Sequence, residues 1–176
     1  LPHLELTREI IRRFFHLYKK QIFPEPEAVL TPVPKVPGLD GRKMSKSYGN
    51  CIYLGDSREE VTKKVKTMVT DPARKLRSDK GHPEVCPVFF YHKLFNKDNV
   101  EMVALECRDA ARGCVDCKME MAARLNEFMD PIREKRELWM KKKMEIRQIL
   151  DRGAKRAREV ASQTLKETLQ AMGLVS

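Results

Sequence analysis

Apolar residues recur at helical spacing along most of the chain, and this pattern predicts a mainly helical protein. The first apolar stripe predicts an amphipathic helix over residues 4–18. A short apolar run over 28–33 predicts a buried strand, and residues 71–85, which hold few apolar side chains, predict a loop. The stripe of the first helix consists of Leu6, Ile10, Phe14 and Leu17.

The second half of the chain carries start and stop signals of several helices. Ser57 and Glu60 have the spacing of a capping box, in which each side chain satisfies a free backbone N–H of the first helical turn. The pair Asp130-Pro131 predicts that one helix ends and another begins there. Gly153 predicts a further break. The apolar stripes of these helices are typical of the core of a helical bundle.

The composition and net charge of the chain indicate what kind of partner it binds. The chain has 176 residues, of which 41% are hydrophobic, so it can bury a core. Its net charge of +10 predicts a polyanionic partner. No apolar run is long enough to cross a bilayer, and we expect no membrane partner. A basic run over 133–147 is interleaved with acids and is equally well a solvated helix face. The better candidates for phosphate contacts are Lys63, Lys64, Lys66, Arg74, Lys75, Arg77 and Lys80.

One loop carries the chemistry needed to hold a polyphosphate. Prolines and glycines flank residues 43–47, so this segment is predicted to lie on a mobile loop. It offers two ammonium groups and two hydroxyls, which bind phosphate oxygens well. A solvated basic surface loop is the plain alternative for most lysine-rich loops.

Four of the five cysteines follow the pattern C-x20-C-x6-C-x2-C. A C-x2-C pair with two further thiols suggests a metal site, and four thiolates suit either tetrahedral zinc or a 4Fe–4S cluster. The spacing does not separate these two groups. Four small, buried, reduced thiols without a metal are the alternative. The cysteines of the pattern are Cys86, Cys107, Cys114 and Cys117, and Cys51 stands apart.

The pentapeptide over residues 43–47 is the signature loop of class I aminoacyl-tRNA synthetases. Together with three other segments, residues 34–50 resemble bacterial tryptophanyl-tRNA synthetases. The resemblance runs nearly end to end over this chain but covers only the C-terminal part of that family's enzyme, and we expect the chain to be cut from a longer protein. The other segments are His3-Leu4-Glu5-Leu6-Thr7-Arg8, Thr70-Asp71-Pro72 and Ala171-Met172-Gly173-Leu174.

The resemblance implies a fold and a function. The fold would be a helical bundle, the anticodon-binding domain, over residues 56–176, preceded over residues 1–55 by the C-terminal edge of a Rossmann-type α/β catalytic domain. The whole enzyme would be a cytoplasmic, homodimeric tryptophan–tRNA ligase that uses ATP with Mg²⁺ to form tryptophanyl-adenylate and charges tRNA(Trp). The family's His-Ile-Gly-His-type motif is absent, so we expect this chain alone to be inactive.

The resemblance also implies roles for single residues. Lys43 and Lys46 would be catalytic, because they would stabilise the charge that grows on the departing pyrophosphate. The four cysteines of the pattern would bind a 4Fe–4S cluster that braces the anticodon-binding helices, as in some bacterial members of the family, with zinc as the alternative. The residues implied to bind ATP are Val36, Lys43, Met44, Ser45, Lys46 and Ser47.

A rival hypothesis from another class is an autonomous RNA-binding module that a metal staples together and that has no catalytic role. The segment over residues 43–47 discriminates between the two, because a pure binding module does not require a phosphate-binding signature loop.

Overall fold

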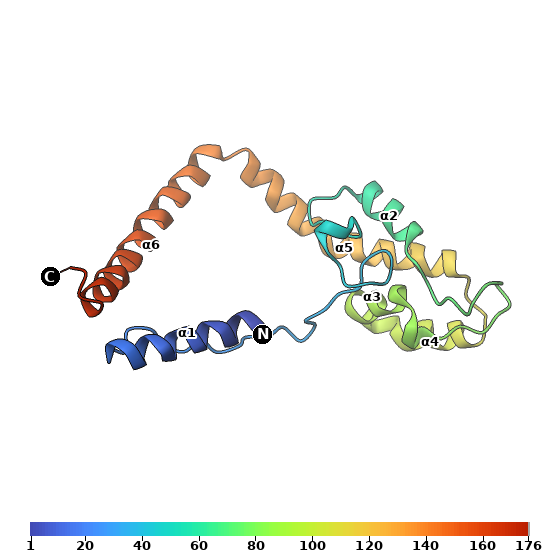
Figure 1. Cartoon of the computed structure of the whole chain (residues 1–176). Helices are drawn as coiled ribbons and strands as arrows, with labels where there is room; N and C mark the ends of the chain where they lie inside the picture. The colour runs from blue at the N-terminus through green and yellow to red at the C-terminus, as the bar shows by residue number, and fades with distance from the viewer. Residues whose placement is uncertain (176) are drawn as a thin grey trace. The chain divides into compact units, whose positions relative to one another are not determined.

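The computed structural model describes residues 1–175, and these residues are mostly helical (Figure 1). No β-strand forms among them, and an isolated antiparallel bridge joins Pro37 to Lys43. The predicted mainly α class is therefore confirmed. The α-helices are α1 (Pro2–Tyr18), α2 (Arg58–Thr67), α3 (Pro87–Phe95), α4 (Val100–Arg108), α5 (Cys114–Met140) and α6 (Lys143–Ala171), and the 3-10 helices are η1 (Lys46–Tyr48), η2 (Pro83–Val85) and η3 (Lys97–Asn99).

The chain divides into two compact units, which are described separately. One unit is residues 33–140, with α2 to α5 and the signature loop. The other combines residues 1–32 with the chain from Lys141 onward. The expected domain boundary between residues 55 and 56 stays a prediction.

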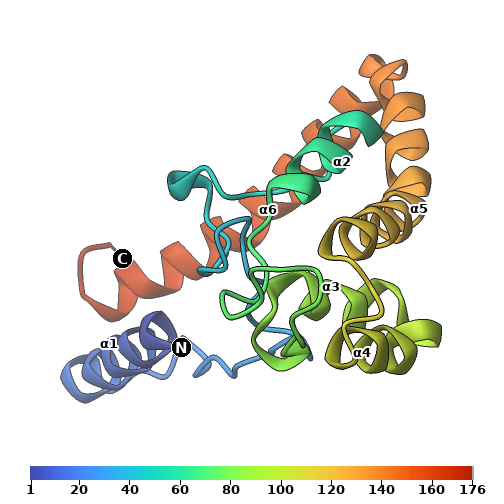
Figure 2. The same ribbon diagram turned by 90° about the vertical axis from the view of Figure 1, so that its right-hand side faces the viewer.

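In the unit of residues 33–140, α2 and α3 both pack against α5 (Figure 2). Helix α2 begins with the predicted capping box: the Ser57 hydroxyl accepts from the Glu60 N–H at 3.2 Å, and the Glu60 carboxylate accepts from the Ser57 N–H at 2.8 Å. The apolar face of α2 is buried, because side chains that recur every three or four residues lie on one side of a helix and face its neighbours. The core consists of Val61, Val65, Met68, Val88, Tyr91, Met121, Ala122, Leu125 and Met129.

Helix α5 runs through Pro131, so the predicted helix boundary at this proline is wrong. Proline removes one backbone hydrogen bond from a helix, but side-chain pairs bridge this turn. Asp130 forms ion pairs with Arg58 of α2 and with Arg133, the latter at 2.7 Å. Arg133 also donates to the Asn126 side chain at 2.8 Å. The carboxylate expected to cap a new helix is therefore used to tie α5 to α2.

Helix α1 is bordered by the segment that follows it. The helix ends where Lys19 takes a left-handed conformation with φ of 56°. The chain then returns along the helix, since Arg12 binds Glu25 through two hydrogen bonds of 2.7 and 2.8 Å, and the Phe14 ring lies 5.2 Å from the Phe23 ring. The predicted helix over residues 4–18 is confirmed.

The predicted strand over residues 28–33 is wrong. Val29 is 95% exposed and Leu30 is 64% exposed, so this apolar run is not buried. A strand needs a second strand for its backbone groups, and no strand forms among residues 1–175.

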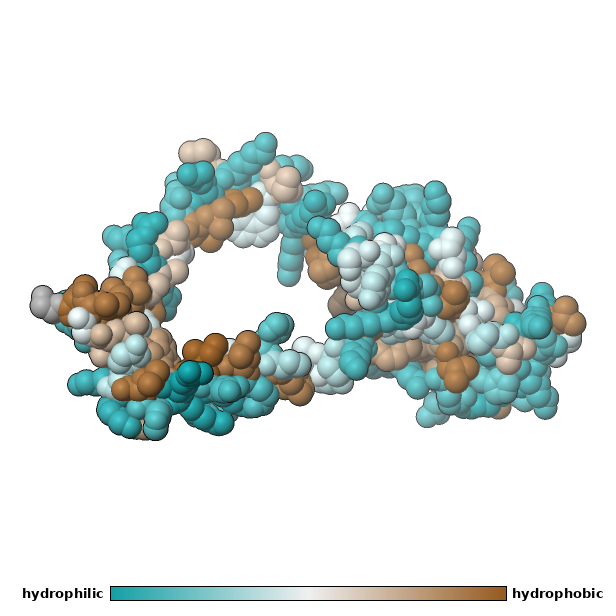
Figure 3. All heavy atoms as spheres, viewed as in Figure 1, coloured by the Kyte–Doolittle hydropathy of each residue, from teal (hydrophilic) through white to brown (hydrophobic). Residues whose placement is uncertain are grey.

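Helix α6 passes through Gly153 without a break, so the break predicted there is also wrong. A glycine costs a helix only about 1 kcal/mol relative to alanine, which a helix of 29 residues tolerates. No residue of α6 is buried, and Figure 3 shows hydrophobic side chains exposed along it. The helices described are all too short or too polar to span a membrane.

Candidate functional site

The signature loop is closed around the side chain of Asn50, which is 4% exposed. Its amide oxygen accepts from the Ser45 N–H at 2.8 Å. Its amide nitrogen donates to the Asp40 carboxylate at 2.7 Å and to the Lys43 carbonyl at 3.3 Å. One buried amide therefore fixes both sides of the loop. The hydrogen bond from Asn50, together with those from Arg42, holds the pKa of Asp40 below its usual value.

Gly38 leaves the space that this amide occupies. A Cβ atom on Gly38 would lie 2.3 Å from the amide nitrogen of Asn50 and 2.8 Å from its carbonyl oxygen, closer than any real contact. The neighbouring Leu39 N–H donates to that carbonyl at 3.0 Å. The glycine before the signature is thus required by packing of the loop on itself.

The two lysines of the signature are exposed on this loop, and within residues 1–175 neither ammonium group forms an ion pair or hydrogen bond. Lys46 begins the 3-10 helix η1, which ends at Gly49 with φ of 65°. The hydroxyls of Ser45 and Ser47 lie 2.8 Å apart. Two free cations and a pair of hydroxyls therefore share one short, internally braced segment, which suits a polyanionic ligand.

Val36 and Met44, the other residues expected to bind ATP, have different surroundings in the loop. Val36 accepts from the Met44 N–H at 2.9 Å, so its carbonyl is occupied within the loop, whereas its N–H has no partner among the described residues. Met44 is half-buried and packs, with Val36, against the helical core. Met44 thus anchors the loop, and a contact from Val36 to a ligand is left to its N–H group.

A buried tyrosine of α3 connects the signature loop to the helices. Tyr91 is 3% exposed, and its hydroxyl donates to the Pro37 carbonyl at 2.7 Å. Burial raises the pKa of Tyr91 strongly, so the hydroxyl stays protonated. The loop is therefore held by a hydrogen bond from a core side chain to its backbone, as well as by apolar contacts.

The four cysteines of the sequence pattern line a single cavity. Cys86 is the N-cap of α3, Cys107 lies in the last turn of α4, and Cys114 and Cys117 lie in the first turn of α5. Three of them, Cys86, Cys114 and Cys117, thus lie at helix N-termini. The sequence alone did not predict that η2 and α4 place Cys86 and Cys107 at the same cavity as Cys114 and Cys117.

Burial favours the neutral thiol at Cys86, Cys107 and Cys117. It raises the pKa of Cys86 and of Cys107, and it raises the pKa of Cys117 to about 12. Binding of a metal would therefore release protons. Within residues 1–175, no group of three or more Cys, His, Asp or Glu side chains is placed to hold a metal ion.

Three polar residues beside the cavity were not predicted as part of the site. Asp71, which is 5% exposed, accepts from the backbone N–H and the ring of His82, both at 2.8 Å, and so closes the loop after α2. The His92 ring nitrogen lies 3.3 Å from the Cys117 sulfur. No spacing signal marks these contacts, because they join residues far apart in the sequence.

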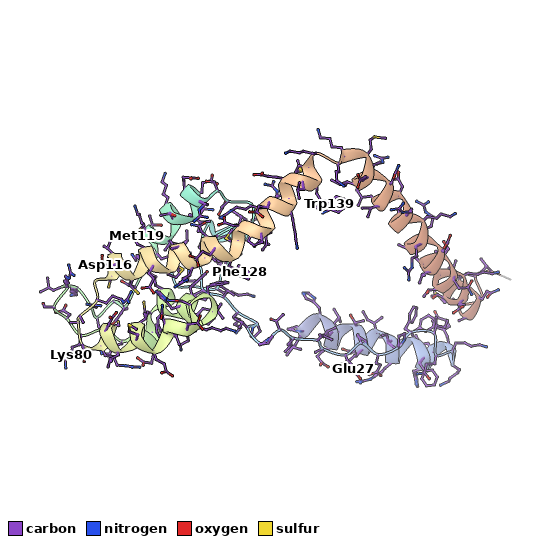
Figure 4. All side chains as sticks on the ribbon, turned by 180° about the vertical axis from the view of Figure 1, so that it is seen from behind. Glu27, Lys80, Asp116, Met119, Phe128 and Trp139 are labelled. Atoms are coloured by element: carbon purple, nitrogen blue, oxygen red, sulfur yellow. The ribbon has the colours of Figure 1, made fainter. Side chains whose placement is uncertain are left out.

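The seven basic residues between Lys63 and Lys80, which are the candidates for phosphate contacts, are not all exposed to a nucleic acid. Arg74 is only 9% exposed, and the ammonium of Lys64 pairs with Asp56 at 2.5 Å. Lys80 lies at the same end of the unit as Asp116, which is in the first turn of α5 (Figure 4). Arg77 approaches Asp116 at 3.8 Å. The role of the run in phosphate binding stays a prediction, and Arg74 is not a surface residue.

The signature loop and the helices around it define the class of protein. Residues 2–130 match the family model described as "tRNA synthetases class I (W and Y)". The chain therefore belongs to this family of class I tRNA synthetases.

The relatives narrow the family to its tryptophan branch. The chain is 51% identical to the tryptophan–tRNA ligase of Aquifex aeolicus over 176 residues, which are 99% of this chain and 44% of that protein. It is 46% identical to the tryptophan–tRNA ligase of Thermotoga maritima, with coverage of 98% and 53%. The chain thus spans about half the length of the relatives it matches. The predicted resemblance to bacterial tryptophanyl-tRNA synthetases is confirmed.

A solved structure agrees with these sequence matches. The tryptophanyl-tRNA synthetase of Campylobacter jejuni, complexed with ADP and tryptophan, superposes with a TM-score of 0.77 at 29% identity. The match covers 98% of this chain and 54% of that one.

Proposed function

We propose that this chain works within an ATP-dependent tryptophan–tRNA ligase, as the part that supplies the signature loop and the helices that bind tRNA(Trp). The observation that carries the proposal is a braced loop with two unpaired ammonium groups, Lys43 and Lys46, in a chain whose relatives are tryptophan–tRNA ligases. The whole enzyme would form tryptophanyl-adenylate from tryptophan and MgATP and transfer the tryptophanyl group to tRNA(Trp).

The loop would act on the leaving group of the first step. The tryptophan carboxylate attacks the α-phosphate, the bond from that phosphorus to the bridging oxygen breaks, and negative charge grows on pyrophosphate. Lys43 and Lys46 would bind those oxygens more tightly in the transition state than in bound ATP, with hydrogen bonds from Ser45 and Ser47. The N–H of Val36 and the backbone of Met44 would complete the contacts to ATP.

The test is ATP–pyrophosphate exchange by the full-length enzyme. Lys46→Ala should lower the rate about 10²–10³-fold, the loss seen when one preorganised donor to a developing anion is removed. Lys20→Ala, which removes an exposed lysine outside the loop, should leave the rate unchanged. Equal rates in the two variants would end the proposed role of Lys46.

The helices would bind the tRNA anticodon, and the net charge of +10 supports an electrostatic share in this binding. Affinity of the full-length enzyme for tRNA(Trp) should therefore fall steeply as salt rises, because phosphate neutralisation releases counterions. A dissociation constant independent of salt would contradict this part of the proposal.

We also propose that Cys86, Cys107, Cys114 and Cys117 hold a 4Fe–4S cluster. A single tetrahedral zinc would require its sulfurs about 3.8 Å apart, given a Zn–S distance of about 2.3 Å. The four cysteines line one cavity, and this shared lining supports a common ligand for all four thiols. When bound, such a cluster supplies covalent bracing and one-electron redox chemistry. Anaerobic protein without iron, or with stoichiometric zinc, would contradict the assignment.

Three further proposals concern the whole protein. It would be a homodimer, it would work in the cytoplasm, and the present chain alone would not activate tryptophan. The rival function, an autonomous RNA-binding module stapled by a metal, lacks a supporting observation, because its kind of protein does not need the free lysines of the signature loop. Inactive full-length enzyme that still binds RNA would favour it.

A further inference from the structure

Arg74 carries a buried positive charge for which the described chain provides no anion. Its side chain is 9% exposed and lines the cavity of the four cysteines. One terminal nitrogen donates to the carbonyls of Arg77 and Arg112 at 2.9 and 2.7 Å, and the other lies 3.9 Å from the Cys107 sulfur. The Nε atom is buried without any hydrogen-bond partner, and no carboxylate pairs with this guanidinium.

The other cation at the cavity is neutralised, which makes the contrast clear. Arg112 also lines the cavity, but it forms ion pairs with both Glu106 and Glu120. The one carboxylate on the cavity wall, Asp71, is used by the N–H groups of Ala73 and His82. A buried charge without a counter-charge costs several kcal/mol, so the arrangement of Arg74 calls for an anion in the cavity.

We propose that Arg74 is a positioning residue that supplies the counter-charge and N–H donors for the anionic group bound by the four cysteines. This inference rests on the 4Fe–4S assignment proposed above. A cluster bound by four thiolates carries net negative charge, and reduction adds one more electron. A fixed cation 3.9 Å from one ligating sulfur stabilises the reduced form more than the oxidised form, and N–H donors to cluster sulfurs act in the same direction.

The test compares reduction potentials of the 176-residue chain after anaerobic reconstitution with ferrous iron and sulfide. Arg74→Met removes the charge and the donors, and it should lower the reduction equilibrium constant at least tenfold, which is about 59 mV for a one-electron couple. Arg74→Lys, which keeps the charge, should move the potential less. Lys75→Met is the matched control, because it removes the same charge from an exposed neighbour and should change the equilibrium constant less than twofold.

Two results would overturn the inference in distinguishable ways. An unaltered chain that takes up no iron would remove the cluster assignment and the role of Arg74 with it. A loaded chain in which Arg74→Met and Lys75→Met have the same potential would remove the role of Arg74 alone. If Arg74→Met loses the helical circular dichroism of the unaltered chain, Arg74→Gln replaces it as the neutral variant, and the same tenfold loss is expected.

Discussion

The substitution Tyr91→Phe tests how the signature loop is attached to the helical core. It removes a single oxygen atom from a side chain that is 3% exposed, and with it the 2.7 Å hydrogen bond to the Pro37 carbonyl. The ring and its packing stay in place. The effect on stability therefore reports the hydrogen bond and little else.

The magnitude follows from the burial of the two partners. A neutral hydrogen bond contributes about 1 kcal/mol net, and a buried acceptor left without a donor adds a further penalty. Pro37 is half-buried, so water reaches its carbonyl only in part. We expect a loss of about 1–2 kcal/mol in the free energy of unfolding. With a urea m-value of about 2 kcal/mol/M, the midpoint should fall by about 0.5–1 M.

The assay is urea unfolding followed by circular dichroism, with Tyr53→Phe as the matched control. Tyr53 is 45% exposed, so the same chemical change there should cost less than about 0.5 kcal/mol. Hydrogen exchange adds a local measurement, because the Met44 N–H, which donates to Val36 at 2.9 Å, should lose protection in Tyr91→Phe only. Equal midpoints and equal Met44 protection in the two variants would refute the reasoning.

Three further predictions concern the packing of the two sites. Gly38→Ala should destabilise the chain by about 1–3 kcal/mol in urea unfolding, because the new Cβ overlaps the Asn50 amide; unchanged stability would contradict the clash. Asn50→Ala should raise the pKa of Asp40, measured by carboxyl carbon NMR, because the largest stabilising hydrogen bond is lost; an unchanged pKa would show that Arg42 alone lowers it. In the unaltered chain, the ionised Asp40 carboxylate stabilises the loop fully above the usual pKa of Asp. This stabilisation is lost as the pH falls through the lowered pKa of Asp40. In chain loaded with the proposed cluster, Gly81→Ala should speed iron release to a chelator several-fold, because its Cβ would lie 2.4 Å from the Cys107 sulfur; an unchanged release rate would contradict this.

Features that depend on residues close together in the sequence were predicted well. The capping box joins Ser57 to Glu60, and both of its hydrogen bonds form. The apolar face of α2 follows from helical spacing and is buried. In such cases both partners lie within one helical turn, so the pattern contains all the information that the structure needs.

Features that depend on distant partners were missed. Pro131 and Gly153 both read as helix breakers, yet α5 and α6 continue through them. At Pro131 the turn is held by the pair of Asp130 with Arg58, a residue of another helix. The apolar run over residues 28–33 failed for the opposite reason, since no partner strand exists among the described residues to cover it.

The same contrast between local and distant partners holds for the candidate sites. The pattern of residues 43–47 and the cysteine spacing named candidate groups for two sites, because signature loops and thiol pairs are short and local, and their roles stay predictions. Asn50, which organises the loop, was not recognised as its hub, since an asparagine after a glycine is an ordinary turn residue.

Arg74 is the clearest case in which counting charges misleads. In the sequence it is one of seven basic residues of a predicted phosphate-binding run, and its type and neighbours give no sign of burial. In the structure the Arg74 side chain is buried and lines the cavity of the four thiols, whereas the neighbouring Lys75 is exposed. A guanidinium that is buried at this cavity cannot also neutralise a phosphate on the protein surface. The surface charge available to RNA is therefore smaller than the sequence suggests, and Lys75 rather than Arg74 should contribute to the salt dependence of tRNA binding.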